Sequence, residues 1–115
     1  AWINFSGLAV DNSDPPDLEG VRGSQNVASL VDHGVGMYTV NFETALAANY
    51  AIAGLGKQDQ APPFIMSPSD GDSLGATDGH DAMDTGSCRI TCILRDSSAE
   101  YKRDGEVITL VFFST

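Results

Sequence analysis

Apolar residues recur at every second position along most of this chain, and that period predicts strands rather than helices. The clearest run is residues 86–95, where Cys88, Ile90, Cys92 and Leu94 alternate with a second set of side chains. The other expected strands are residues 2–5, 21–31, 37–42, 50–55 and 106–113. The Gly-containing turn at residues 32–36 joins two of these runs, which is typical of a β-hairpin.

The last expected strand, residues 106–113, differs from the others because both of its faces are apolar. A strand with this pattern is buried on both sides. We expect one side to face the core of the domain and a neighbouring subunit to cover the other. We assign Ile108, Leu110 and Phe112 to that subunit interface. The opposite face carries Val107, Val111 and Phe113.

The strands are separated by long polar segments at residues 6–20, 57–86 and 96–105. A chain of 115 residues has room for one domain. We therefore predict a single all-β domain over residues 1–115. Its expected architecture is an antiparallel β-sandwich, jelly-roll-like, with about seven or eight strands and long loops.

Charge narrows the range of partners. Sixteen acidic residues face six basic ones, so the net charge is -10. A nucleic-acid backbone or an anionic membrane would be repelled, and we expect neither as a partner. The segment AWINFSGLAV lacks the basic start of a secretory signal.

The chain has two cysteines, Cys88 and Cys92, on one expected strand. Four residues of extended chain separate their Cα atoms by roughly 13 Å. A disulfide needs Cα atoms within about 7 Å, so the two thiols are too far apart to bridge each other. We expect two reduced thiols in the core, with a metal or redox pair as the alternative.

Six segments, in order along the chain, carry a resemblance to a known family. They are AWINF (1–5), VRGSQNVASL (21–30), VDHGVGMYTVNF (31–42), ALAANYAIAG (45–54), SCRITCILRD (87–96) and DGEVITLVFF (104–113). Together they resemble the C-terminal module of bacteriophage tail-fibre and virion appendage proteins. The turn followed by Tyr-Thr-Val-Asn-Phe is the most specific part. The loops at 6–20 and 57–86 look longer than is usual in that family.

The resemblance implies a structural protein of the virion, commonly a homotrimer, with other virion proteins as partners. We expect a tail-fibre tip or knob that attaches to the host surface through its long loops. The alternative is a capsid-decorating or head-appendage protein that binds the major capsid protein. A host surface glycan is the candidate ligand.

Candidate ligand contacts lie in the long loops. Phe64 and Tyr101 are expected there and offer flat apolar faces to a sugar ring. Asp70 and Asp72, separated by a glycine, have the oxygen ligands that calcium prefers. A further metal group would be Asp78, His80 and Asp81. The alternative is a solvated acidic loop without cofactor, and we expect no bound cofactor other than calcium.

No catalytic motif supports an enzyme. The chain has no Gly-x-Ser-x-Gly elbow and no glycine-rich loop with a lysine for nucleotides. Its two histidines, His33 and His80, are interpreted as turn or loop residues. We therefore expect a binding protein.

Overall fold

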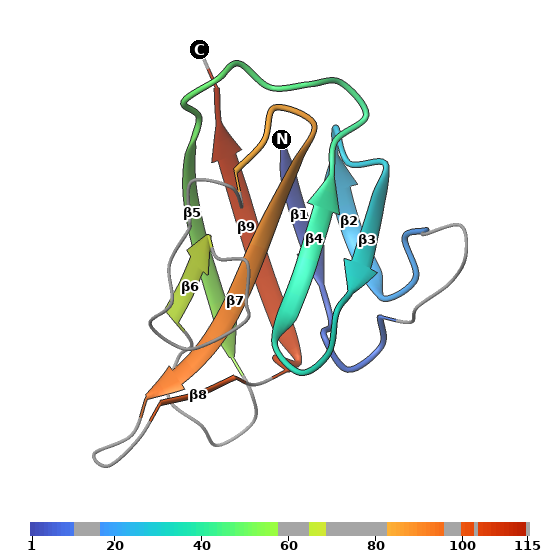
Figure 1. The fold of residues 1–115 in the computed structure, drawn as a ribbon. Coiled ribbons are helices and arrows are strands. Elements are labelled where there is room, and N and C mark those ends of the chain that lie inside the picture. Colours follow the sequence, from blue (N-terminus) through green and yellow to red (C-terminus); the bar gives the residue numbers. More distant parts are fainter. Residues whose placement is uncertain (11–16, 58–64, 69–82, 96–99, 103, 115) are drawn as a thin grey trace.

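The computed structural model describes residues 1–10, 17–57, 65–68, 83–95, 100–102 and 104–114, which form nine strands and no helix. They make two antiparallel sheets (Figure 1). Sheet A has the strand order β2-β1-β9-β5, with β1 (Trp2–Phe5), β2 (Val21–Gln25), β5 (Ala51–Lys57) and β9 (Val107–Phe113). Sheet B has the order β3-β4-β7-β6, with β3 (Ser29–Asp32), β4 (Met37–Asn41), β6 (Ile65–Pro68) and β7 (Ser87–Arg95), while β8 (Glu100–Lys102) also pairs with β7.

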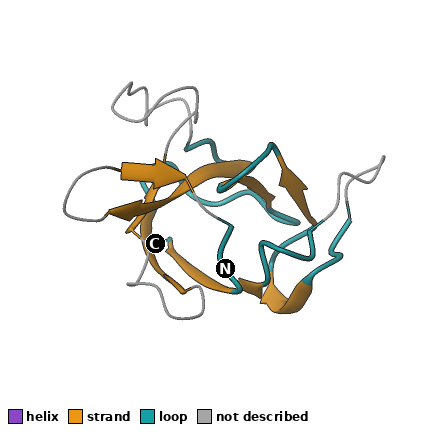
Figure 2. Cartoon of the chain, turned by 90° about the horizontal axis from the view of Figure 1, so that it is seen from below, coloured by secondary structure: helices purple, strands orange, loops and turns teal. Residues whose placement is uncertain are grey.

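The chain crosses repeatedly between the sheets, after β2, β4, β5 and β8. The first and last strands meet at the centre of sheet A, where Trp2 lies opposite Val111 and Phe5 opposite Ile108. Seen from the end, the strands form two layers (Figure 2). This arrangement confirms the predicted all-β antiparallel sandwich.

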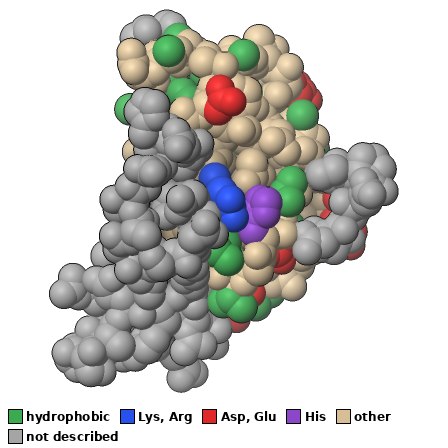
Figure 3. All heavy atoms as spheres, viewed as in Figure 1, with side chains coloured by type: hydrophobic (Ala, Val, Ile, Leu, Met, Phe, Trp, Pro, Cys, Tyr) green, Lys and Arg blue, Asp and Glu red, His purple; other side chains and the backbone are tan. Residues whose placement is uncertain are grey.

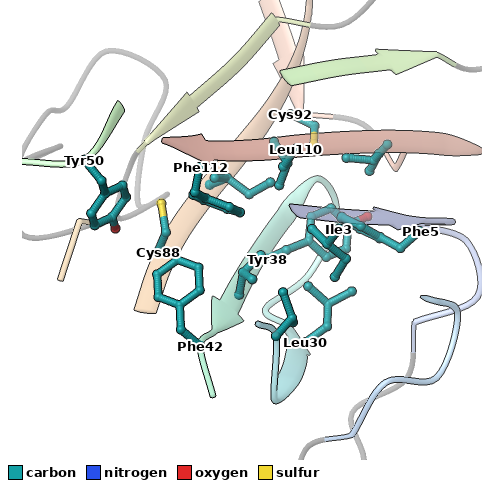
Figure 4. Packing of buried hydrophobic residues seen from close by; sticks show 14 residues of the cluster. Ile3, Phe5, Leu30, Tyr38, Phe42, Tyr50, Cys88, Cys92, Leu110 and Phe112 are labelled. Atoms are coloured by element: carbon teal, nitrogen blue, oxygen red, sulfur yellow. The ribbon is translucent and has the colours of Figure 1, made fainter. Parts of the chain in front are cut away.

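Both sheets contribute alternate side chains to one core. Sheet A supplies Ile3, Phe5, Ile108, Leu110 and Phe112, and sheet B supplies Leu30, Tyr38, Val40, Cys88, Ile90 and Cys92 (Figure 4). Edge-to-face aromatic pairs link the layers, with ring centroids 5.1 Å apart for Phe5–Tyr38 and 5.0 Å apart for Phe42–Phe112. The predicted core face of β7 is confirmed at Cys88, Ile90 and Cys92.

The cysteines behave as predicted: the two thiols form no disulfide and are buried in the core. Burial raises the pKa of the Cys88 thiol to about 11 and that of Cys92 to about 12. Such thiols stay protonated and unreactive at neutral pH.

Two expectations about the elements were wrong. Residues 21–31 form two strands in different sheets, because the chain turns at Asn26, whose φ is 58°. The segments 57–86 and 96–105 are not wholly irregular, since each contains a short strand, β6 and β8 respectively. Tyr101 therefore lies in a strand, not in a loop.

Candidate functional site

The interface prediction for β9 selected the wrong face of the strand. Ile108 and Leu110 are 0% exposed and Phe112 is 3% exposed, because sheet B already covers them. They cannot contact another subunit. The alternation then directs Val107, Thr109, Val111 and Phe113 outward. A clue was present in the sequence: Thr109 places a polar group in this set, whereas the inward set is wholly apolar.

The outward side of sheet A forms a continuous apolar surface, which we call the outer face of sheet A. Strand pairing aligns Trp2, Val111 and Ala53 in one row across three strands. Leu55 lies opposite Thr109 in the next row. The full set is Trp2, Asn4, Gly23, Gln25, Ala51, Ala53, Leu55, Lys57, Val107, Thr109, Val111 and Phe113.

Large apolar side chains on this face are open to solvent. Leu55 is 72% exposed, Phe113 58%, Val107 43% and Trp2 39%. Two shallow depressions cross the same surface and share Leu55 and Thr109 in their linings. Contiguous exposed apolar surface of this kind marks interaction sites in soluble proteins.

The polar groups at the centre of the face satisfy each other. Asn4 Nδ2 donates a hydrogen bond of 2.7 Å to Thr109 Oγ1, across the β1–β9 pair. One polar group of each side chain is already paired. Covering Asn4 and Thr109 with another protein surface therefore costs less desolvation energy than covering two unpaired polar side chains. Lys57, at one edge, is the only charged residue of the set.

The Trp2 ring packs over β2 at Gly23, which has no side chain. A Cβ added at Gly23 would lie 3.1 Å from the Trp2 ring. The indole therefore lies against the β2 backbone and extends the apolar surface toward that edge.

The outward side of sheet B, on the other side of the sandwich, carries polar and charged groups. Arg89 and Thr39 are register partners on β7 and β4, and His33 Nε2 lies 2.7 Å from Thr39 Oγ1. Burial, and then the charge of Arg89, lower the pKa of His33, while Asp32 opposes the shift. Figure 3 shows the histidine beside a basic side chain on this surface. Sequence reasoning did not identify this group, because it interpreted His33 as a turn residue and took no account of Arg89.

A partly buried polar cluster joins the two sheets at one end of the sandwich. Tyr38 Oη donates a hydrogen bond of 2.6 Å to Asp104 Oδ1, which also accepts one of 2.8 Å from the Gly36 N–H. Burial, and then the hydrogen bond to Asp104, raise the pKa of Tyr38 far above its usual range. The cluster is partly buried and ties the β3–β4 turn to the segment before β9, so we assign it a structural role.

Comparisons with protein families, with characterised proteins and with solved structures find no match to this chain. The resemblance to tail-fibre modules therefore stays a prediction.

The predicted loop sites cannot be located. Phe64, Asp70, Asp72, Asp78, His80 and Asp81 lie outside the described residues, as does the side chain of Tyr101. Within the residues that are described, no three His, Cys, Asp or Glu side chains come together as metal ligands. Over the same residues, no helix is long and apolar enough to cross a membrane.

Proposed function

We propose that this chain is a non-enzymatic virion module at the tip of a bacteriophage tail fibre, where it forms a homotrimer and attaches the particle to its host. The virion assignment is supported by the resemblance, which spans the whole chain. The assembly is supported by the outer face of sheet A. That face is the observation on which the proposal chiefly depends.

Charge favours a second copy of this chain as the occupant of the outer face of sheet A. Two chains of net charge -10 repel each other, and the repulsion is weakest where the surfaces that meet are uncharged. The outer face of sheet A carries Lys57 at its edge and no acidic residue. A basic partner would instead gain energy from an acidic surface. An apolar face in a strongly acidic chain therefore favours an equally apolar partner, and a second copy supplies one.

The size of the face sets an expectation for affinity. Four strands spaced about 4.8 Å apart, with about six residues of 3.3 Å each, give a footprint of roughly 400 Å². A standard protein interface buries about 800 Å² per partner. We therefore expect contacts outside the sheet to add to the interface. If these additional contacts are few, the assembly should dissociate on dilution.

In such an assembly sheet B would point away from the shared face. Several copies on one particle would allow weak single contacts to add up through avidity. This division assigns assembly to the outer face of sheet A and host contact to the rest of the sandwich.

Immunogold electron microscopy tests the location. Antibodies raised against the purified chain would be applied to intact particles whose genome encodes it, with antibody preabsorbed on the purified chain as the control. We expect gold at the fibre ends. Gold on the capsid shell would overturn the fibre assignment in favour of the capsid-decorating role, and unlabelled particles would overturn the virion assignment.

A further inference from the structure

A cavity of about 290 Å³ opens at one end of the sandwich, where the connection from β4 to β5 passes the segment that enters β7 (Figure 1). Its lining consists of Ala48, Asn49, Tyr50, Met83, Asp84 and Thr85. Asn49, Asp84 and Thr85 are exposed, so a ligand in solvent reaches their side chains directly. None of the six residues belongs to the outer face of sheet A, so assembly through that face does not use them.

Hydrogen bonds hold the two walls of this cavity together. The Leu46 N–H donates one of 2.8 Å to the Thr85 carbonyl oxygen, and the Tyr50 hydroxyl donates one of 3.1 Å to the Asp84 carbonyl oxygen. The Tyr50 ring is fixed from behind by Phe42, with ring centroids 5.9 Å apart (Figure 4). The cavity is therefore formed before a ligand arrives, and its occupation requires little ordering of the protein.

Two side chains bring hydrogen-bonding groups to the cavity that their described neighbours do not use. Asp84 Oδ1 accepts a hydrogen bond of 2.6 Å from the Thr85 N–H, which fixes the carboxylate. The second oxygen, Asp84 Oδ2, has no partner among the described residues, and the same holds for the Asn49 side-chain amide. The cavity therefore offers one charged acceptor beside an amide that both donates and accepts.

These groups indicate an uncharged ligand that carries neighbouring hydroxyl groups. Hydroxyls donate to the Asp84 carboxylate and exchange hydrogen bonds with the Asn49 amide. An anion would be repelled by Asp84 and by the net charge of -10. Ala48, Tyr50 and Met83 complete the lining with apolar surface, which suits the C–H face of a sugar ring. Ligand sites usually measure roughly 300–1,000 Å³, so a cavity of this size fits a single sugar unit.

We propose that Asn49 and Asp84 bind neighbouring hydroxyl groups of a neutral sugar unit in a host surface glycan, with the apolar lining against the sugar ring. This inference rests on the proposed attachment function and adds the ligand class to it.

NMR titrations of the isotope-labelled chain with the methyl glycosides of glucose, galactose and mannose test the site. We expect at least one of these sugars to shift the signals of the Asn49 side-chain amide and the Thr85 N–H. Cyclohexanol, a ring with a single hydroxyl, is the control and should bind at least tenfold more weakly. Shifts by none of the three sugars, or equally tight binding of cyclohexanol, would overturn the proposal.

Three variants make the test specific. Asp84→Asn keeps the acceptor for the Thr85 N–H and removes the charge, so we expect binding about tenfold weaker. Asn49→Gly removes the amide and tolerates the backbone φ of 68° at this position, and it should also weaken binding.

Asp32→Asn is the matched control for the loss of charge. The Asp32 carboxylate likewise accepts a hydrogen bond from a backbone N–H, that of Gly34, but it lies in the β3–β4 turn at the other end of the sandwich (Figure 1). This variant should bind the sugar as tightly as the unaltered chain. Unaltered affinity in both Asp84→Asn and Asn49→Gly would overturn the assignment.

The same samples separate this site from the proposed function. A trimer that binds none of the sugars would contradict the sugar site and leave the assembly intact. A monomer that binds a sugar through Asp84 would contradict the assembly and leave the site intact.

Discussion

At the residue scale, the structure depends on one glycine that has no room for a side chain. A Cβ on Gly7 would overlap the Tyr38 hydroxyl and lie 3.1 Å from the Gly105 carbonyl oxygen. The Gly7 N–H donates a hydrogen bond of 2.7 Å to that same carbonyl. Gly7 therefore allows the segment after β1 to pack directly onto the Tyr38–Asp104 cluster.

Replacing this glycine should destabilise the fold through a clash that a second substitution relieves. We expect Gly7→Ala to lower the free energy of unfolding by about 2 kcal/mol, because the new methyl group displaces Tyr38. Tyr38→Phe should cost about 1–3 kcal/mol, because it removes the hydrogen bond from the buried Tyr38 hydroxyl to the Asp104 carboxylate.

Urea unfolding of both single variants and the double variant measures the coupling between the two sites. The double variant should be more stable than the sum of the two losses predicts, because phenylalanine has no hydroxyl to clash. Strict additivity would contradict this account of Gly7.

The burial of individual residues could be predicted where a strand has one polar face. Cys88 and Ile90 alternate with Arg89, so their inward direction followed from the sequence. In β9 the two faces differ only by Thr109, and that single polar group was not used to decide which face the core would take. The prediction therefore assigned the interface to the inward residues Ile108, Leu110 and Phe112. We still expect another subunit to cover the outward face of β9.

At the element scale, the change of sheet between β2 and β3 depends on Asn26. Its side chain accepts a hydrogen bond of 2.7 Å from the Thr44 N–H and donates one of 2.9 Å to the Thr44 carbonyl. Its φ of 58° lies in the left-handed region, which asparagine tolerates better than most residues. One residue thus turns the chain out of sheet A and holds the segment that follows β4.

Two substitutions of Asn26 separate the contribution of its side-chain hydrogen bonds from that of its left-handed backbone conformation. Asn26→Gly keeps the backbone conformation and loses the side-chain hydrogen bonds, so we expect a loss of about 1 kcal/mol. Asn26→Ala adds backbone strain and should lose about 1–2 kcal/mol more. Thermal unfolding of both variants provides the measurement, and equal stability of the two would show that the left-handed conformation contributes nothing.

Most strand positions followed from the period of two, but the break at Asn26 did not. Residues 21–31 contain no proline and no obvious turn pair, so propensity alone indicated one strand. The break depends on contacts with Thr44, which is distant in sequence. The short strands β6 and β8 were missed because they lie within long polar segments, where pairing with β7 and not local propensity forms them.

At the scale of the whole molecule, the two outer faces of the sandwich differ in chemistry. Sheet A presents Trp2, Leu55 and Phe113 to solvent, whereas sheet B presents Arg89 beside His33. The pairing of the first and last strands joins residues about a hundred positions apart, as in the Asn4–Thr109 hydrogen bond. No local pattern predicts such pairing, so the composition of each face became visible only in the folded chain.

The molar mass in solution, measured by light scattering, tests most directly whether the outer face of sheet A is a subunit interface. Leu55→Lys is the decisive variant, because it lessens the net charge that opposes association and yet places a charge within the face. Val35→Lys is its matched control, since Val35 is also exposed but lies in the β3–β4 turn.

We predict about three times the chain mass of 12.1 kDa for the unaltered protein and for Val35→Lys, and a single chain mass for Leu55→Lys. An unaltered protein that remains a monomer at every concentration, or a Leu55→Lys variant that assembles as fully as its control, would contradict the account.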